Sequence, residues 1–124
     1  MVEDLDEIEW FDQREITHGR KYPTLGLQRR GTATLNKAAM DALGNPEALA
    51  VGYIPSSRTV AIKGVARGAK GAISHHKVSN SSTALFSLVA FTERYSIPHD
   101  QARQYAGEAR GGVLLFPLDQ SEPL

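Results

Sequence analysis

Residues 30–65 constrain the fold more than any other part of the chain, because residues that start and stop helices divide them at definite points. Residues 31–35 (GTATL) alternate small or apolar residues with Thr, which predicts a short strand. Asn36 is a favourable N-cap, and the KAAMDAL that follows is rich in helix formers. Gly44 suits the left-handed position after a helix, and Pro46 prevents the helix from continuing.

A hairpin is predicted directly after this helix. Residues 48–54 (ALAVGYI) form an apolar run typical of a strand, and the turn Pro55-Ser56-Ser57-Arg58 follows. Residues 59–65 (TVAIKGV) then return as the second strand, with Arg58 expected at a solvated tip. Residues 30–65 therefore predict a strand, a helix and a hairpin in succession.

The same succession is expected a second time in residues 77–117. Residues 77–85 are β-prone, Ser87 is the expected cap of a short helix that reaches Tyr95, and residues 102–108 and 113–116 predict a hairpin. Residues 32–36 align with 83–87, residues 43–46 with 95–98, and residues 60–62 with 113–115. The alignment indicates an internal repeat of about 52 residues.

We therefore predict an α+β fold, in which two tandem strand–helix–hairpin units form a small mixed sheet or barrel with short helices. The single compact domain is expected over residues 29–117, with units 30–65 and 77–117 joined by a basic, Gly-containing linker, residues 66–76. Residues 1–28 are expected to be a loosely ordered acidic arm and residues 118–124 a tail.

The composition argues against several classes of protein. The chain has 124 residues and no cysteine, so it suits one domain and has no disulfide, thiolate metal site or cysteine nucleophile. No apolar run approaches the ~20 residues that span a bilayer, and the acidic N-terminus does not resemble a signal peptide, so we expect a cytoplasmic protein with no membrane association. No G-x-S-x-G, P-loop, H-E-x-x-H or G-x-G-x-x-G motif is present, and adjacent His75 and His76 would point in opposite directions from a strand. We expect no catalytic residues, no cofactor and no metal.

The charge is distributed unevenly, although the net charge is zero. Residues 1–12 hold six acids and no base, residues 13–77 carry a net charge of +8, and residues 78–124 carry −2. Such asymmetry is typical of a body that binds a polyanion and has an acidic tail. The alternative is that the charges only solvate separate faces of the protein.

The basic residues of the central segment are the candidate nucleic-acid contacts, because Lys and Arg supply the attraction to phosphate that dominates such binding. They are Arg29, Arg30, Lys37, Lys63, Arg67, Lys70 and Lys77. Aromatic residues are not interleaved with them, so a platform for stacking bases is less supported. Trp10 and Phe11 stand in the acidic arm, where they would bind a partner protein or dock on the domain itself.

Residues 30–44 (RGTATLNKAAMDALG), followed by a hairpin that ends in Val60-Ala61-Ile62, resemble the AbrB/MraZ-like swapped-hairpin regulators. The resemblance implies a strand, a short helix and a hairpin, present twice in MraZ-type members. It also implies dimerisation by exchanged or interleaved hairpins, and DNA contacts from Arg29, Arg30 and Lys37. The chain departs from the family pattern at Asn36, where Pro is usual, and at Glu47-Ala48, where Gly-Asp is usual.

These observations predict a non-enzymatic, homodimeric protein that binds double-stranded DNA, as a transcription regulator of phage or plasmid type. The alternative is a protein-interaction or oligomer-forming accessory protein that engages its partner through Trp10 and Phe11.

Overall fold

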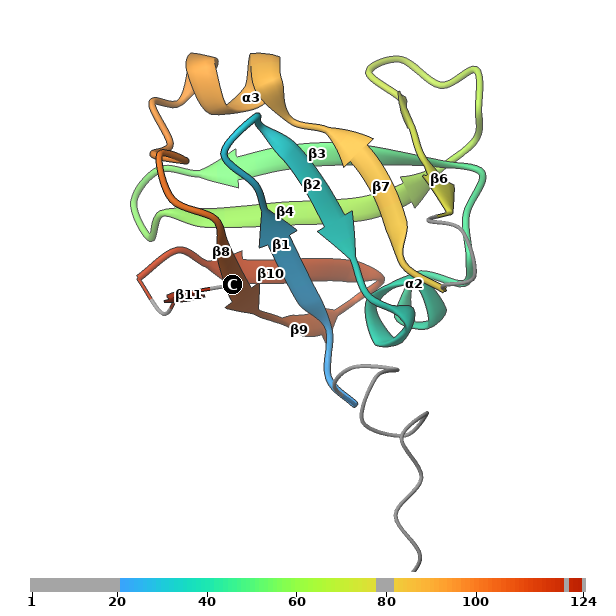
Figure 1. Ribbon diagram of the computed structural model, residues 1–124. Helices are drawn as coiled ribbons and strands as arrows, with labels where there is room; N and C mark the ends of the chain where they lie inside the picture. The colour runs from blue at the N-terminus through green and yellow to red at the C-terminus, as the bar shows by residue number, and fades with distance from the viewer. Residues whose placement is uncertain (1–20, 78–81, 120, 124) are drawn as a thin grey trace, which may run out of the picture.

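The computed structural model describes residues 21–77, 82–119 and 121–123, which form two antiparallel sheets and two short helices. Sheet A has the strand order β11-β8-β1-β2-β7-β6, and sheet B has the order β5-β3-β4-β10-β9. Figure 1 shows sheet A in front of sheet B, with the strands of the two sheets crossing steeply.

Most of the strands are short. Sheet A consists of β1 (Thr24–Leu27), β2 (Thr32–Leu35), β6 (His76–Lys77), β7 (Ala84–Ser87), β8 (Arg103–Ala106) and β11 (Ser121–Pro123). Sheet B consists of β3 (Ala48–Ile54), β4 (Thr59–Val65), β5 (Ile73–Ser74), β9 (Glu108–Arg110) and β10 (Val113–Pro117). The helices are α2 (Lys37–Ala42) and α3 (Val89–Arg94), and Figure 1 shows them at opposite ends of the molecule.

The core lies between the sheets, where the two units pair with each other. In sheet A, β2 pairs with β7 so that Ala33 lies opposite Phe86 and Leu35 lies opposite Ala84. Each pair sets a small side chain against a large one, and all four residues are buried. This arrangement lets two strands contribute large side chains without overfilling the core.

The strands β4 and β10 pair reciprocally in sheet B, with Val60 opposite Phe116 and Ile62 opposite Leu114. All four side chains are buried. Full burial of a side chain of this kind contributes about 1.5–3 kcal/mol. The alignment of residues 60–62 with 113–115 expected from the sequence matches Val60, which is buried, with Val113, which is only partly buried, so it sets inward-facing residues of β4 against outward-facing residues of β10.

Both helices end in the same hydrogen-bond pattern, 52 residues apart. The Asn45 amide donates to the Met40 carbonyl (2.8 Å), and the Ile97 amide donates to the Thr92 carbonyl (2.9 Å). In both cases the bond closes the last turn back to the carbonyl five residues earlier, as in a Schellman motif.

At each of these helix ends, a proline stands two residues after a residue in the left-handed conformation. Gly44 has φ +76°, and Ser96, 52 residues later, has φ +53°. Pro46 and Pro98 then stand at equivalent positions. The predicted alignment of residues 43–46 with 95–98 therefore agrees with the backbone, although serine adopts this conformation less readily than glycine.

The two helices begin differently. Asn36 Oδ1 accepts from the Ala39 amide (3.0 Å), which makes Asn36 the N-cap of α2 as predicted. The predicted cap of the second helix was one residue early, because Ser87 is the last residue of β7 and Leu88 is the N-cap of α3, although Ser87 Oγ accepts from the Val89 amide (3.4 Å). The Leu88 amide is instead bonded to the Gly31 carbonyl (2.8 Å), which ties the start of α3 to sheet A.

The acidic arm was predicted to extend over residues 1–28, but residues near its end belong to the folded domain. Thr24 to Leu27 form β1, a central strand of sheet A whose four residues are all buried. Gly26 and the nearby Pro23 resemble chain breakers in the sequence, but Leu25 and Leu27 supply the apolar side chains that bury the strand.

Other boundaries also shift. The predicted linker, residues 66–76, contains β5 and the first residue of β6, and the predicted tail, residues 118–124, contains β11. All strand pairs among the described residues are antiparallel and fall into two sheets that do not close, so the expected α+β class with short helices is confirmed, whereas the expected barrel does not form.

The chain passes from sheet A to sheet B at Gly107, between β8 and β9. A Cβ atom at this position would lie 2.4 Å from Cδ1 of Phe116, closer than atoms can approach. Glycine is therefore required here by the close approach of the backbone to a core ring.

Replacing Asn36 by Ala should lower the free energy of unfolding by about 1–2 kcal/mol, because α2 loses its cap. Asn36 also joins α2 to sheet A, since Oδ1 accepts from the Thr24 amide (3.0 Å) and Nδ2 donates to the Tyr22 carbonyl (2.9 Å). Urea denaturation measures the change. Ser87→Ala, at the aligned position, is the matched control and should cost less than about 0.5 kcal/mol, because the bond that its Oγ accepts from the Val89 amide is long (3.4 Å) and exposed. Equal losses in the two variants would contradict the assigned caps.

Gly107→Ala should destabilise the protein by about 1–3 kcal/mol, because the added methyl group displaces the ring of Phe116. Gly52→Ala in β3 is the control, since nothing lies within 4 Å of a Cβ atom there. Thermal unfolding should show a clearly lower melting temperature for Gly107→Ala alone. A melting temperature equal to that of the control would show that the core accepts the methyl group.

Candidate nucleic-acid interface

The seven basic residues predicted to contact nucleic acid are all exposed, but they do not form one patch. They divide into Arg29 and Arg30 in the β1–β2 turn, Arg67 and Lys70 in the loop of residues 66–72, Lys37 and Lys77 near α2, and Lys63 on β4. The sequence therefore indicated which basic residues are exposed, but their closeness in the sequence did not indicate how they are grouped on the surface.

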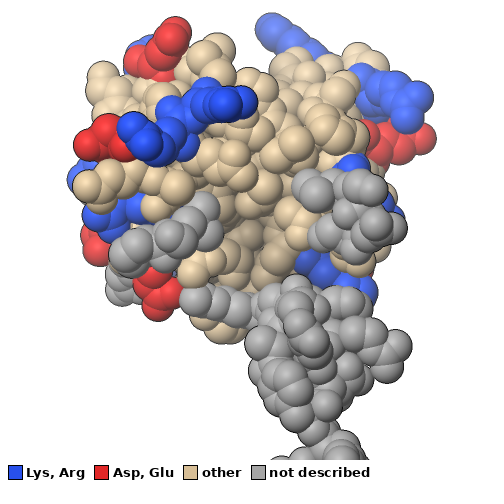
Figure 2. Space-filling view, in the orientation of Figure 1, with Lys and Arg blue, Asp and Glu red and all other residues tan. Residues whose placement is uncertain are grey.

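The β1–β2 turn, α3 and the loop of residues 66–72 lie at the same end of the molecule, the upper end in Figure 1. Figure 2 shows Lys and Arg atoms spaced along this upper edge. We call this surface the basic rim and define it as Arg29, Arg30, Arg67, Lys70 and Arg94. Arg94, the last residue of α3, was not among the predicted residues.

Backbone contacts fix the part of the rim around the β1–β2 turn. The Gly31 amide donates to the Gln28 carbonyl (2.9 Å), which closes the turn, and Nδ1 of His99 lies 2.8 Å from the Arg29 carbonyl. Gly31 has φ +82°, and a Cβ atom there would lie 2.8 Å from Val89 of α3. Glycine thus lets the turn that carries Arg29 and Arg30 pack directly on α3.

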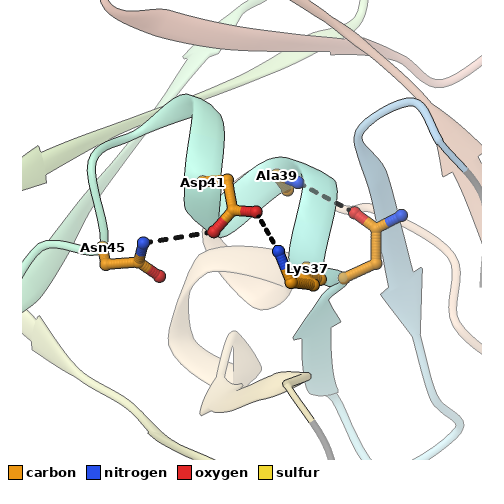
Figure 3. Close-up of polar contacts among 5 residues, drawn as sticks. Lys37, Ala39, Asp41 and Asn45 are labelled. Carbon is orange, nitrogen blue, oxygen red and sulfur yellow. Dashed lines mark hydrogen bonds and ion pairs between the residues drawn. The ribbon is translucent and has the colours of Figure 1, made fainter. Parts of the chain in front are cut away.

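Lys37 and Lys77 lie at a different place, around Asp41. Nζ of Lys37 lies 2.5 Å from Oδ2 of Asp41, and Nδ2 of Asn45 donates to Oδ1 (3.2 Å), as Figure 3 shows. The hydrogen bond from Lys37, the one from Asn45 and the charges of Lys37 and Lys77 hold the pKa of Asp41 below its usual value of 3.8. Asp41 therefore stays ionised and offsets part of the positive charge at this place.

Lys63 lies on neither of these surfaces. Its neighbour Ile62 is buried in the core, and Lys63 is exposed on the opposite, outer face of sheet B. Of the seven predicted residues, Arg29, Arg30, Arg67 and Lys70 thus stand on segments at the same end of the molecule.

The described residues carry a net charge of +5, because twelve Lys and Arg stand against seven Asp and Glu. The ion pairs between described residues are Lys37–Asp41 and Arg110–Glu108, and neither includes a residue of the basic rim. Arg67 contacts Glu47 through its backbone amide, which donates to Oε2 (3.4 Å). Most of the rim charge is therefore available to an anionic ligand.

Three aromatic rings gather at α3, which the sequence did not predict. The ring centroids of Tyr53 and Tyr95 are 4.7 Å apart, and those of Phe91 and Tyr95 are 5.0 Å apart. The guanidinium of Arg94 lies over Tyr95, 5.1 Å from the ring centroid, in a cation–π contact. The spacing of Phe91 and Tyr95 by four residues on a helix was the only local signal, since Tyr53 arrives from β3.

Trp10 and Phe11, the predicted partner-binding residues, lie outside the described residues. Within the described part of the chain, no group of three His, Asp or Glu side chains is arranged to hold a metal ion. Nε2 of His75 is 2.8 Å from the Pro46 carbonyl, so this ring bonds to the backbone, whereas His76 is exposed. None of the helices found there is long and apolar enough to cross a membrane.

Comparison with protein-family models, curated proteins and solved structures found no match to this chain. The resemblance to the swapped-hairpin regulators therefore stays a prediction, and the functional argument rests on the residues of the chain itself.

Lys37→Ala should raise the pKa of Asp41 towards 3.8, because Asp41 loses its principal hydrogen bond and a nearby positive charge. The stability that this pair adds is present at neutral pH and is lost as the pH falls through the lowered pKa of Asp41. Titration of the Asp41 carboxyl by NMR measures the pKa. Asn45→Ala removes the second contributor and should raise the pKa less. An unchanged pKa in Lys37→Ala would contradict this ion pair in solution.

Proposed function

We propose that this protein binds double-stranded DNA through the basic rim, without catalysing a reaction. The observation that carries the proposal is the net charge of +5 on the described residues, together with a rim whose residues make no ion pair within them. Exposed Lys and Arg release condensed counterions when they contact phosphates, and this release supplies most of the affinity for a duplex.

The arrangement of the rim suits contact with an extended backbone. Arg29 and Arg30 stand on a turn that packs on α3, so their backbone needs little ordering when a ligand binds. Lys70 stands in a loop closed by the bonds from the Ala69 amide to the Ala66 carbonyl (3.0 Å) and from the Ala72 amide to the Ala69 carbonyl (3.1 Å). The two segments would contact phosphates at separate points, which fixes orientation but carries no sequence information.

The acidic segment supports a regulated form of this activity. Residues 1–12 hold six acids and no base, so they can compete with phosphates for the basic rim as an internal polyanion. Within DNA binding, a role in transcription regulation rests on the resemblance to the swapped-hairpin regulators.

Homodimerisation, which the resemblance also implies, stays a prediction. Within one chain, β2 already pairs with β7, and β4 pairs with β10. A dimer formed by exchanged hairpins would have to replace these pairs within one chain by the same pairs between two chains.

Binding of the full chain to random-sequence duplex should weaken steeply between about 50 mM and about 200 mM salt, because counterion release drives it. Arg29→Ala/Arg30→Ala should reduce the slope of log affinity against log salt by about 2, since each phosphate contact contributes about 0.9. Fluorescence anisotropy with a labelled duplex measures both quantities. Deleting residues 1–12 should strengthen binding.

The matched control for this experiment is Lys21→Ala/Arg110→Ala, which removes the same charge from two exposed residues outside the rim. Its salt slope should stay close to that of the full chain. Equal losses in both double variants would show that net charge alone, and not the rim, attracts DNA. Absence of binding at low salt by the full chain and by the shortened chain would rule out the proposal.

A further inference from the structure

A pocket of about 140 Å³ lies where the β3–β4 turn meets β8 and the segment after α3. Ile97 and Leu118 form its apolar part, and Arg58, Arg103 and Tyr105 supply polar groups. Its volume exceeds the ~10–15 Å³ needed by one water and is well below the ~300–1,000 Å³ of sites for drug-sized ligands. A ligand of a few heavy atoms fits such a space.

Tyr105 gives the pocket a hydrogen-bond donor that the fold does not use. The residue is only 4% exposed, and its hydroxyl has no hydrogen-bond partner among the described residues. Burial raises the pKa of Tyr105, so the hydroxyl stays protonated at neutral pH and can donate. The hydroxyl is not among the enclosed polar atoms that lack a partner in the described residues, so it meets solvent in the pocket and can donate to a ligand acceptor there.

Arg103 is oriented by its neighbours and keeps donors to spare. Nη1 donates to Oγ of Ser121 (2.8 Å), and Nη2 lies 3.4 Å from Oε1 of Gln101. A guanidinium has five N–H donors, so most of them remain for a ligand. Its partners hold the planar group in place beside the Tyr105 hydroxyl, where its positive charge acts on that group.

Arg58 reaches the same pocket from the β3–β4 turn. Its backbone has φ +49°, and its carbonyl accepts from the Leu118 amide (2.9 Å), which fixes the turn against the chain after β10. Its guanidinium makes no ion pair with a described residue, and its charge also acts on the Tyr105 hydroxyl. Arg58 is exposed in this turn, as expected, and it also lines the pocket.

We infer that this pocket binds a small oxyanion, a carboxylate or a phosphate, held by the guanidiniums of Arg58 and Arg103 and by the hydroxyl of Tyr105. Guanidinium groups match the geometry of these anions and bond to them more strongly than neutral donors do. Asp100, which is exposed and also lines the pocket, opposes the anion and limits the charge that the site accepts. The site shares no residue with the basic rim, so the inference does not depend on the proposed function.

The test uses the full chain, titrated separately with sodium phosphate and with sodium acetate at constant ionic strength maintained with sodium chloride. Amide chemical shifts recorded by NMR should change in a saturable way around Arg58 and Tyr105. Absence of saturable change with both anions would overturn the inference.

Four variants assign the binding to the pocket. Arg58→Asn should weaken it about tenfold or more, because a charge-assisted hydrogen bond is lost while Asn tolerates the left-handed backbone at this position. Tyr105→Phe should weaken it less, and Asp100→Asn should strengthen it. Arg110→Asn is the charge-matched control outside the pocket. Equal weakening in Arg58→Asn and Arg110→Asn would overturn the inference, because it would show that the ions respond only to net charge.

The DNA assay separates the two sources of such an anion. If Arg58→Asn weakens phosphate binding but binds duplex as Arg110→Asn does, the ligand is a free ion. If Arg58→Asn also weakens duplex binding more than Arg110→Asn does, the pocket holds a phosphate of the nucleic acid. Either result, together with saturable binding, supports the oxyanion site.

Discussion

The fold depends on the reciprocal pairing of its two units, through β2 with β7 in sheet A and β4 with β10 in sheet B. A single strand–helix–hairpin unit has one apolar face and nothing to cover it, so it would leave residues such as Leu35 and Ile62 in water. The partner unit supplies Phe86, which lies opposite Ala33, and Phe116, which lies opposite Val60. The helices are only six residues long and are held by these sheets, because helices of this length are not stable alone.

The first unit could be predicted almost residue by residue, and the second only in outline. In the first unit each boundary has a local chemical cause: Asn36 caps α2, and Gly44 takes the left-handed position after it. In the second unit the start of α3 is set by a bond to Gly31, far away in the sequence, and the left-handed residue is Ser96. The strand β1 was not predicted, because Gly26 resembles a chain breaker in the sequence although it lies in a buried strand.

The candidate sites were less predictable than the fold, because charge along a sequence does not fix charge in space. Lys37 stands seven residues after Arg30, yet α2 and the β1–β2 turn lie at opposite ends of β2, so the two belong to different surfaces. Tyr53 joins Phe91 and Tyr95 only because β3 brings it to α3. The pocket of Arg58 and Arg103 similarly joins a turn to a strand about 45 residues away.

Joining both units in one chain has a consequence for how their surfaces can evolve. An assembly of identical units must display each surface residue twice, once on either side of its symmetry axis. In this chain a mutation changes only one of the two units, so the side chains around α2 and around α3 can become different. One carries the Lys37–Asp41 ion pair, and the other carries an aromatic cluster with Arg94. The covalent link therefore preserves the paired core while giving the molecule two chemically distinct poles.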